Sequence, residues 1–107
     1  VGCFRELAEA GGYESTDYYT NVDRVEFGNI DNIHAVRFSY KKTFQLCNNF
    51  IDLQSFWTKL ESFNWMNMIW KILTGSVQVA THLKSGQTVL IHCTDGWDRT
   101  AQICSLV

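Results

Sequence analysis

A short apolar run near the carboxyl end, residues 88–92, restricts the folds open to this sequence more than any other feature. It is rich in β-branched residues and continuous rather than alternating, which is typical of a strand buried in a mostly parallel sheet. Residues 100–107 have helical character and stop after about two turns. Because one strand pair cannot form a covered parallel sheet, we interpret residues 1–107 as part of a larger α/β domain, truncated at both ends.

Helical spacing of apolar residues occupies the middle of the chain. It predicts a helix over 33–47, with Asp31 or Asn32 as its N-cap, and a shorter helix over 53–62. Val22, Val25 and Phe27 suggest a short strand that ends before Gly28 and Asn29.

A third and longer helix is predicted to begin after Asn64 and to end at Ser85 and Gly86. Its apolar stripe consists of Trp65, Met68, Ile69, Ile72, Leu73, Ser76, Ala80 and Leu83. We interpret this stripe as core-facing, because apolar residues at this period usually face a core. A further helix is expected over 4–10, before two glycines.

Composition excludes several classes of protein. The net charge is −2 and the pI about 5.8, which argues against a general nucleic-acid binder. Residues 72–83 form a charge-free stretch of 12 residues, shorter than the ~20 that a spanning helix needs. The four cysteines are irregularly spaced and include no Cys-x-x-Cys pair, so we expect reduced cysteines in a cytosolic protein.

The candidate chemistry lies in residues 93–100, between the predicted last strand and last helix. Gly96 permits a left-handed turn, so successive amides can form an anion cradle at a helix start. Arg99 can donate to two phosphate oxygens at once, which lysine cannot match. Cys93 would lie at the bottom of this cradle, where its pKa is expected to be lowered and its thiolate to act as nucleophile. The pattern predicts phosphoryl transfer from an ester to sulfur, followed by hydrolysis of the thiophosphate.

The leaving alkoxide of such a reaction needs a proton donor. Asp95 and Asp98 are the candidates inside the loop. The Thr100 hydroxyl could bond the sulfur or hold the water of the second step. His92 could form a hydrogen bond with the loop backbone and orient it.

Cysteine followed six positions later by arginine is a weak signal by itself. The strand before it, the helix after it, the glycine within the loop and the threonine after the arginine make it specific. The structural alternative is a buried Cys93, a core Trp97 and a surface Arg99.

Residues 92–100 read His-Cys-Thr-Asp-Gly-Trp-Asp-Arg-Thr, which resembles the signature loop of the myotubularin family of Cys-dependent phosphoinositide 3-phosphatases. The Gly-Trp-Asp-Arg-Thr core is more specific than the general Cys-x5-Arg phosphatase motif. Other similar segments are Gly11-Gly12-Tyr13-Glu14, Asn32-Ile33-His34 with Arg37 and Ser39, Leu60-Glu61-Ser62 with Trp65, and Ser85-Gly86. The resemblance covers essentially the whole chain. It implies a protein-tyrosine-phosphatase-like domain, with a central mostly parallel sheet flanked by helices and a strand–P-loop–helix unit at the C-terminal end.

The resemblance also implies a role for each residue of the loop. Cys93 would be the nucleophile, Arg99 the phosphate clamp and Asp98 a general acid within the loop. Asp95 would face the inositol ring and help to select the substrate. The residues expected to bind the phosphate or headgroup are Thr94, Asp95, Gly96, Trp97, Asp98, Arg99 and Asn32, with His92 and Thr100 in support.

The role of Asn32 has an alternative explanation, and no cofactor or metal is expected. Asn32 matches a family position near the substrate pocket, but a helix cap explains it equally well. The mechanism is thiol-based, so no cofactor is implied, and no cluster has the spacing of metal ligands.

The implied activity is removal of the 3-phosphate from phosphatidylinositol 3-phosphate and the 3,5-bisphosphate through a cysteinyl-phosphate intermediate. The implied partner is a lipid headgroup at a membrane surface, with a cytoplasmic, peripheral location on endosomal membranes and no nucleic acid. Homo- or hetero-oligomers through regions outside these residues stay open. Two alternative functions also stay open: a weak or inactive phosphoinositide-binding or scaffold subunit, and a protein tyrosine or dual-specificity phosphatase.

The sequence departs from the family pattern at four places. Thr94 replaces the usual serine, residues 6–10 lack a family asparagine, Met68 stands where a histidine is usual, and Phe38 stands where an acidic residue is common. None of these changes touches the reacting atoms. We expect residues 1–107 alone to fold poorly and to be inactive.

Overall fold

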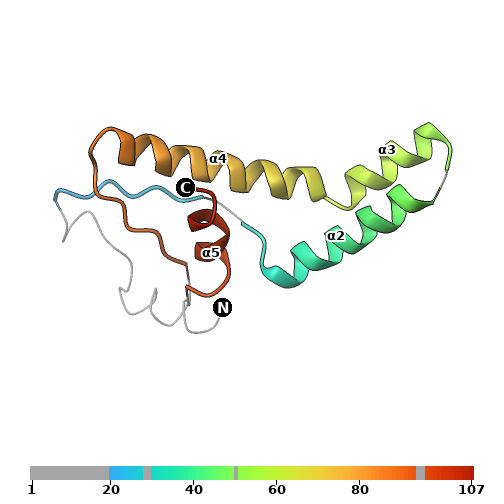
Figure 1. The fold of residues 1–107 in the computed structure, drawn as a ribbon, viewed down its shortest axis with the longest axis horizontal. Coiled ribbons are helices and arrows are strands. Elements are labelled where there is room, and N and C mark those ends of the chain that lie inside the picture. Colours follow the sequence, from blue (N-terminus) through green and yellow to red (C-terminus); the bar gives the residue numbers. More distant parts are fainter. Residues whose placement is uncertain (1–19, 28–29, 50, 94–95) are drawn as a thin grey trace.

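The computed structural model describes residues 20–27, 30–49, 51–93 and 96–107. These residues contain α2 (Ile33–Asn48), α3 (Leu53–Ser62), α4 (Trp65–Lys84) and α5 (Arg99–Cys104), as Figure 1 shows. The helix expected over 4–10 lies outside the described residues.

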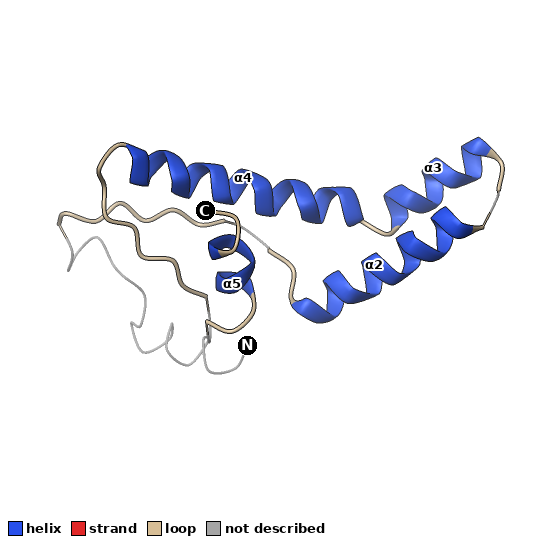
Figure 2. Ribbon diagram, viewed as in Figure 1, coloured by secondary structure: helices blue, strands red, loops and turns tan. Residues whose placement is uncertain are grey.

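The predicted α/β fold with a central parallel sheet is wrong for this structure, because the described residues form helices and no β-strand (Figure 2). The two segments predicted as strands, 22–27 and 88–92, are extended but irregular. A helix forms its hydrogen bonds within itself, whereas a strand needs a neighbouring strand, and this part of the chain provides none. Leu90 is 78% exposed between the half-buried Val89 and Ile91, so this run packs on one side only. Of the expected strand–P-loop–helix unit, the described residues contain the helix.

Side-chain caps begin two of the helices where the sequence predicted them. Asn32 Oδ1 accepts a hydrogen bond from the Ala35 amide at 3.0 Å and begins α2. Asp52 Oδ1 accepts one from the Ser55 amide at 2.9 Å and begins α3. Hydrogen bonds from the side chain and backbone of Ser55 hold the pKa of Asp52 below its ordinary value of 3.8, so this cap is charged at neutral pH. The predicted bounds of both helices are confirmed to within one residue.

The ends of α4 are also where the sequence predicted them. Asn64 has a left-handed backbone with φ of 60°, which asparagine tolerates better than most residues. Its side chain does not cap the helix backbone but accepts a hydrogen bond from the Asn67 side chain at 3.0 Å. Gly86, with φ of 81°, follows the last turn and allows the chain to leave the helix.

The longest helix, α4, is the centre of the packing. Both α2 and α5 pack against it, and α3 packs against α2 and α4. In Figure 1, α5 lies beneath α4 and the α2–α3 hairpin lies beside the start of α4. The Cα radius of gyration is 17.5 Å, above the ~13 Å of a compact domain of this length. Among the described residues, the buried apolar side chains are accordingly few: Leu46, Met68, Val79 and Ile103.

The core-facing stripe of α4 was predicted correctly in part. Met68 and Ser76 are buried as expected, but Leu73 and Leu83 are exposed. Val79, which was outside the predicted stripe, is buried instead. The buried face differs from the predicted stripe because it depends on what packs against α4: Ile103 of α5 and the Phe27 ring lie close to Gly75, about one turn before Val79. No helix among the described residues is long and apolar enough to cross a membrane.

The contact between α4 and α5 depends on a glycine. A Cβ at Gly75 would lie 3.0 Å from Ile103 Cδ1 and 3.6 Å from the Phe27 ring, so its absence permits the close approach of both. Next to it, the Ser76 hydroxyl donates to Ile72 O at 2.8 Å and lies 3.4 Å from Ile103 O. This contact fixes α5, and with it the end of the candidate loop, on α4.

Ile103→Ala is expected to lower the free energy of unfolding by about 2–5 kcal/mol, because it opens a cavity between α4 and α5. Ile103 is only 1% exposed. The measurement is urea denaturation of the full-length protein that carries this chain. Leu106→Ala is the control, because Leu106 is 54% exposed and its loss is expected to change stability by about 0.5 kcal/mol or less. Equal effects of the two variants would contradict this packing.

Candidate active site

The nucleophile candidate is held by the turn that follows it. Cys93 is half-buried, and its Sγ accepts a hydrogen bond from the Gly96 amide at 3.2 Å. Gly96 has φ of 78°, a left-handed conformation that glycine adopts without steric cost and that turns its amide back toward the sulfur. An N–H directed at sulfur stabilises a thiolate more than a thiol. The described part of the loop therefore favours the reactive form of Cys93.

Of the residues next to Cys93 and Gly96, His92 contacts the loop backbone and Trp97 is exposed to solvent. His92 Nδ1 lies 3.3 Å from Cys93 O, and because a carbonyl only accepts, the histidine donates here. Thr94 and Asp95 lie outside the described residues. Trp97 is 86% exposed, so its interpretation as a core residue is wrong.

Asp98 connects the loop to a helix that begins 65 residues earlier in the chain. It occupies the N-cap position of α5, yet its carboxylate does not cap that helix. Instead Oδ2 accepts a hydrogen bond from the Ile33 amide at 2.6 Å, and Oδ1 accepts one from Gln102 Nε2 at 2.8 Å. The start of α2 and the first turn of α5 therefore share this one carboxylate.

Gln102 extends the connection, and sequence reasoning missed it. Its Nε2 also donates to Asp31 O at 3.1 Å. The Asp31 carboxylate in turn lies 3.6 Å from Lys71 Nζ on α4, and both side chains are largely buried. The signal that could have identified Gln102 is its position four residues after Asp98 on a helix, where side chains meet.

The remaining predicted site residues lie near this junction. Asn32 precedes Ile33, so the cap of α2 is beside the residue that binds Asp98. Arg99 is half-buried and is the first residue of α5. Thr100 Oγ1 is buried and has no hydrogen-bond partner among the residues that the structure describes.

An open hollow of about 360 Å³ lies against this junction. It is lined by Ile33, Trp97, Asp98, Ala101, Gln102 and Ser105. Its wall therefore combines a carboxylate, an amide and a hydroxyl group with an exposed tryptophan side chain. The hollow is large enough for a small polar group.

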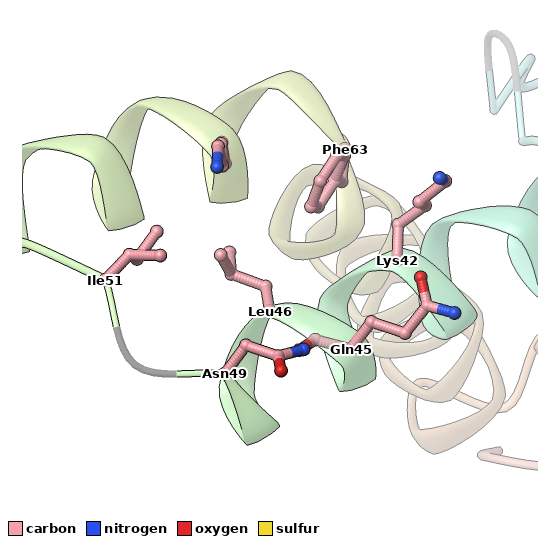
Figure 3. Close-up of a pocket in the computed structure, with 7 residues that line it drawn as sticks. Lys42, Gln45, Leu46, Asn49, Ile51 and Phe63 are labelled. Atoms are coloured by element: carbon pink, nitrogen blue, oxygen red, sulfur yellow. The ribbon is translucent and has the colours of Figure 1, made fainter.

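A second hollow, of about 250 Å³, lies between α2 and α3 (Figure 3). It is lined by Lys42, Gln45, Leu46, Asn49, Ile51, Lys59 and Phe63. In Figure 3 the side chain of Leu46 points toward Ile51, while Lys42 extends away from both. Lys42 Nζ lies 5.7 Å from the Phe38 ring centroid. No cysteine lines this hollow, and its wall shares no residue with the loop.

Metal and disulfide chemistry find no support in the described segments. No three His, Cys, Asp or Glu side chains in them gather in an arrangement that could hold a metal ion. Cys47 and Cys104 are exposed and form no disulfide there. The chemistry that the described geometry offers is a sulfur nucleophile beside an amide, with a carboxyl group and an arginine in the same loop.

The chain is similar to known phosphatases along nearly all of its length. The chain matches the family of myotubularin-like phosphatase domains over residues 2–107. It is 45% identical to a protein named myotubularin from Xenopus tropicalis, over 99% of this chain and 18% of that protein. It is 37% identical to the phosphatidylinositol-3,5-bisphosphate 3-phosphatase MTMR3 of Caenorhabditis elegans, over 99% of this chain and 10% of that protein. For MTMR8 of Gallus gallus, which has the same enzyme name, the identity is 42% over 92% of this chain and 16% of that protein.

The chain thus spans less than a fifth of the length of these relatives. Its similarity nevertheless extends over nearly all of its own residues and includes the whole candidate loop. The chain belongs to the myotubularin-like phosphatase family.

Proposed function

We propose that this chain supplies the catalytic loop of a phosphoinositide 3-phosphatase. The observation that carries the proposal is the hydrogen bond from the Gly96 amide to Cys93 Sγ, inside a loop that ends in Arg99 at a helix start. The amide and the glycine turn favour an anionic sulfur, and Arg99 can bind two oxygens of a phosphate. The names of the MTMR3 and MTMR8 relatives support the lipid as the substrate class.

The reaction that fits these groups has two steps. In the first, the Cys93 thiolate attacks phosphorus, the S–P bond forms, and the P–O bond to the inositol ring breaks. Asp98 gives a proton to the departing oxygen while Arg99 binds the phosphate oxygens. In the second step water attacks phosphorus and gives a proton to the Asp98 carboxylate, the S–P bond breaks, and inorganic phosphate and the thiolate are released.

Asp98 can donate a proton only while one of its oxygens carries hydrogen. In this structure both oxygens accept hydrogen bonds, from Ile33 and Gln102. Each carboxylate oxygen has two lone pairs, so Asp98 can take up a proton beside these hydrogen bonds, and the bond to the protonated oxygen becomes weaker.

The finer parts of the proposal concern the substrate and its location. We infer action on phosphatidylinositol 3-phosphate and the 3,5-bisphosphate at a membrane surface, with a cytoplasmic, peripheral location on endosomes. The family resemblance of the loop and the relatives' names support the substrate, and a lipid substrate in turn requires contact with a membrane.

The test is phosphate release by the full-length protein that carries this chain. Vesicles containing phosphatidylinositol 3-phosphate or the 3,5-bisphosphate are compared with a phosphotyrosine peptide. We expect a higher kcat/KM on the lipids. Preference for the peptide would identify a protein phosphatase instead, and no release from any of the three would indicate a binding or scaffold subunit.

A further inference from the structure

We propose that Gln102 is a positioning residue that fixes the Asp98 carboxyl group and determines which of its oxygens carries the proton. This inference rests on the proposed function, because it assigns Asp98 the role of general acid. Gln102 is half-buried and lies on α5, one turn after Asp98.

The Gln102 amide has two hydrogens, and each has an acceptor. Nε2 lies 2.8 Å from Asp98 Oδ1 and 3.1 Å from Asp31 O. The opposite orientation of the amide would place Oε1 against these two oxygens, which is repulsive, so the donor orientation is fixed. Oε1 is buried and has no hydrogen-bond partner within the described residues. A buried acceptor without a hydrogen bond is unfavourable. The stabilising contribution of Gln102 therefore comes from its Nε2 donor and not from Oε1.

Two donors from different helices hold the Asp98 carboxylate. The Ile33 amide binds Oδ2 and Gln102 binds Oδ1. An aspartate at the N-cap position ordinarily turns toward its own helix, yet this one turns toward α2. Gln102 is the contact within α5 that holds it in that direction.

The two contacts differ in how easily they can be given up. Gln102 is half-buried and its second hydrogen is already bound to Asp31 O, so releasing Oδ1 would leave a buried donor unsatisfied. The hydrogen bond from the Ile33 amide is exposed to solvent, whereas that from Gln102 is partly buried, so water can replace Oδ2 at the Ile33 amide. Oδ1 therefore stays anchored, and Oδ2 is the oxygen that takes up the proton and delivers it.

The test uses Gln102→Met, which has similar length and no donor, in the full-length protein. A lipid substrate needs an acid for its alkoxide, whereas an aryl phosphate with an acidic phenol leaves without one. We expect kcat on phosphatidylinositol 3-phosphate to fall about tenfold, part of the roughly 10²–10⁴ that a positioned acid contributes. We expect kcat on the aryl phosphate to change less than about twofold. Gln78→Met, at an exposed position of α4, is the matched control and is expected to have no effect.

A second variant, Gln102→Glu, adds a pH signature. At neutral pH two adjacent carboxylates repel and the donor is lost, so turnover of the lipid is expected to fall further. At lower pH the pair can share one proton and restore a hydrogen bond, so the lipid activity relative to wild type is expected to recover. A structural defect alone would affect both substrates equally.

Each outcome decides a different claim. Equal losses on lipid and aryl phosphate, or no loss on either, would overturn the positioning role while leaving the phosphatase proposal intact. No phosphate release from any substrate by the wild-type protein would overturn the proposed function and the role of Gln102 with it.

Discussion

Cys93→Ser is expected to abolish phosphate release from phosphatidylinositol 3-phosphate, by roughly 10⁴-fold or more, the scale observed when an enzyme loses its nucleophile. A serine hydroxyl is not ionised near neutral pH, so it lacks the reactivity of the Cys93 thiolate toward phosphorus. The hydroxyl can still accept the hydrogen bond that the Gly96 amide gives to Cys93 Sγ. The loss is therefore chemical rather than structural.

Two measurements check this result in the full-length protein. Steady-state phosphate release gives the rate, and intact mass after acid quenching detects the covalent phosphate, which is expected in the wild type and absent from Cys93→Ser. Cys104→Ser is the matched control, because Cys104 is an exposed cysteine at the end of α5 and outside the proposed chemistry. Unchanged turnover by Cys93→Ser would refute the sulfur mechanism.

Asp98→Ala is expected to have two separable effects. Loss of the acid should lower kcat on the lipid by about 10²–10⁴-fold, and much less on an aryl phosphate with a good leaving group. Loss of the acceptor for the Ile33 amide should also lower stability by about 1 kcal/mol, the scale of a lost helix cap. Turnover of the two substrates and thermal unfolding of the full-length protein measure these effects independently.

The control for Asp98→Ala is Asp52→Ala. Asp52 caps α3 through the Ser55 amide, so its loss also weakens a helix start, at a position away from the loop. We expect Asp52→Ala to reduce stability and to leave kcat on both substrates unchanged. If Asp52→Ala reduced lipid turnover as much as Asp98→Ala, the role of Asp98 would be structural only.

The fold was predictable where its causes are local. The caps Asn32 and Asp52 and the glycine that follows α4 are visible in a few consecutive residues, and the helices begin and end there. The predicted sheet failed because strand formation depends on partners remote in sequence, and residues 88–92 have no ladder within the described segments. The buried face of α4 was misjudged for a similar reason, since segments remote in sequence, α5 among them, decide which of its residues are covered.

In the candidate site, too, the features with local causes could be predicted and those that depend on remote residues could not. The sequence of the loop indicated Cys93, Gly96 and Arg99 directly, because spacing and residue type are enough to suggest a phosphate cradle. The contact between Asp98 and the Ile33 amide joins positions 65 residues apart, and no local pattern predicts it. Gln102 lay within reach of prediction through its i+4 spacing from Asp98.

The hydrogen bond between the first amide of α2 and Asp98 couples the orientation of the whole helix to the position of the proposed acid. A rod of 16 residues is about 24 Å long, so a tilt of about 5° about its far end moves its near end by about 2 Å. Such a displacement breaks a hydrogen bond of 2.6 Å. The buried Ser39 hydroxyl donates a hydrogen bond to Phe63 O at 2.5 Å and so holds α2 against the end of α3. Ser39 therefore helps to fix the orientation of the Asp98 carboxyl group without contacting it.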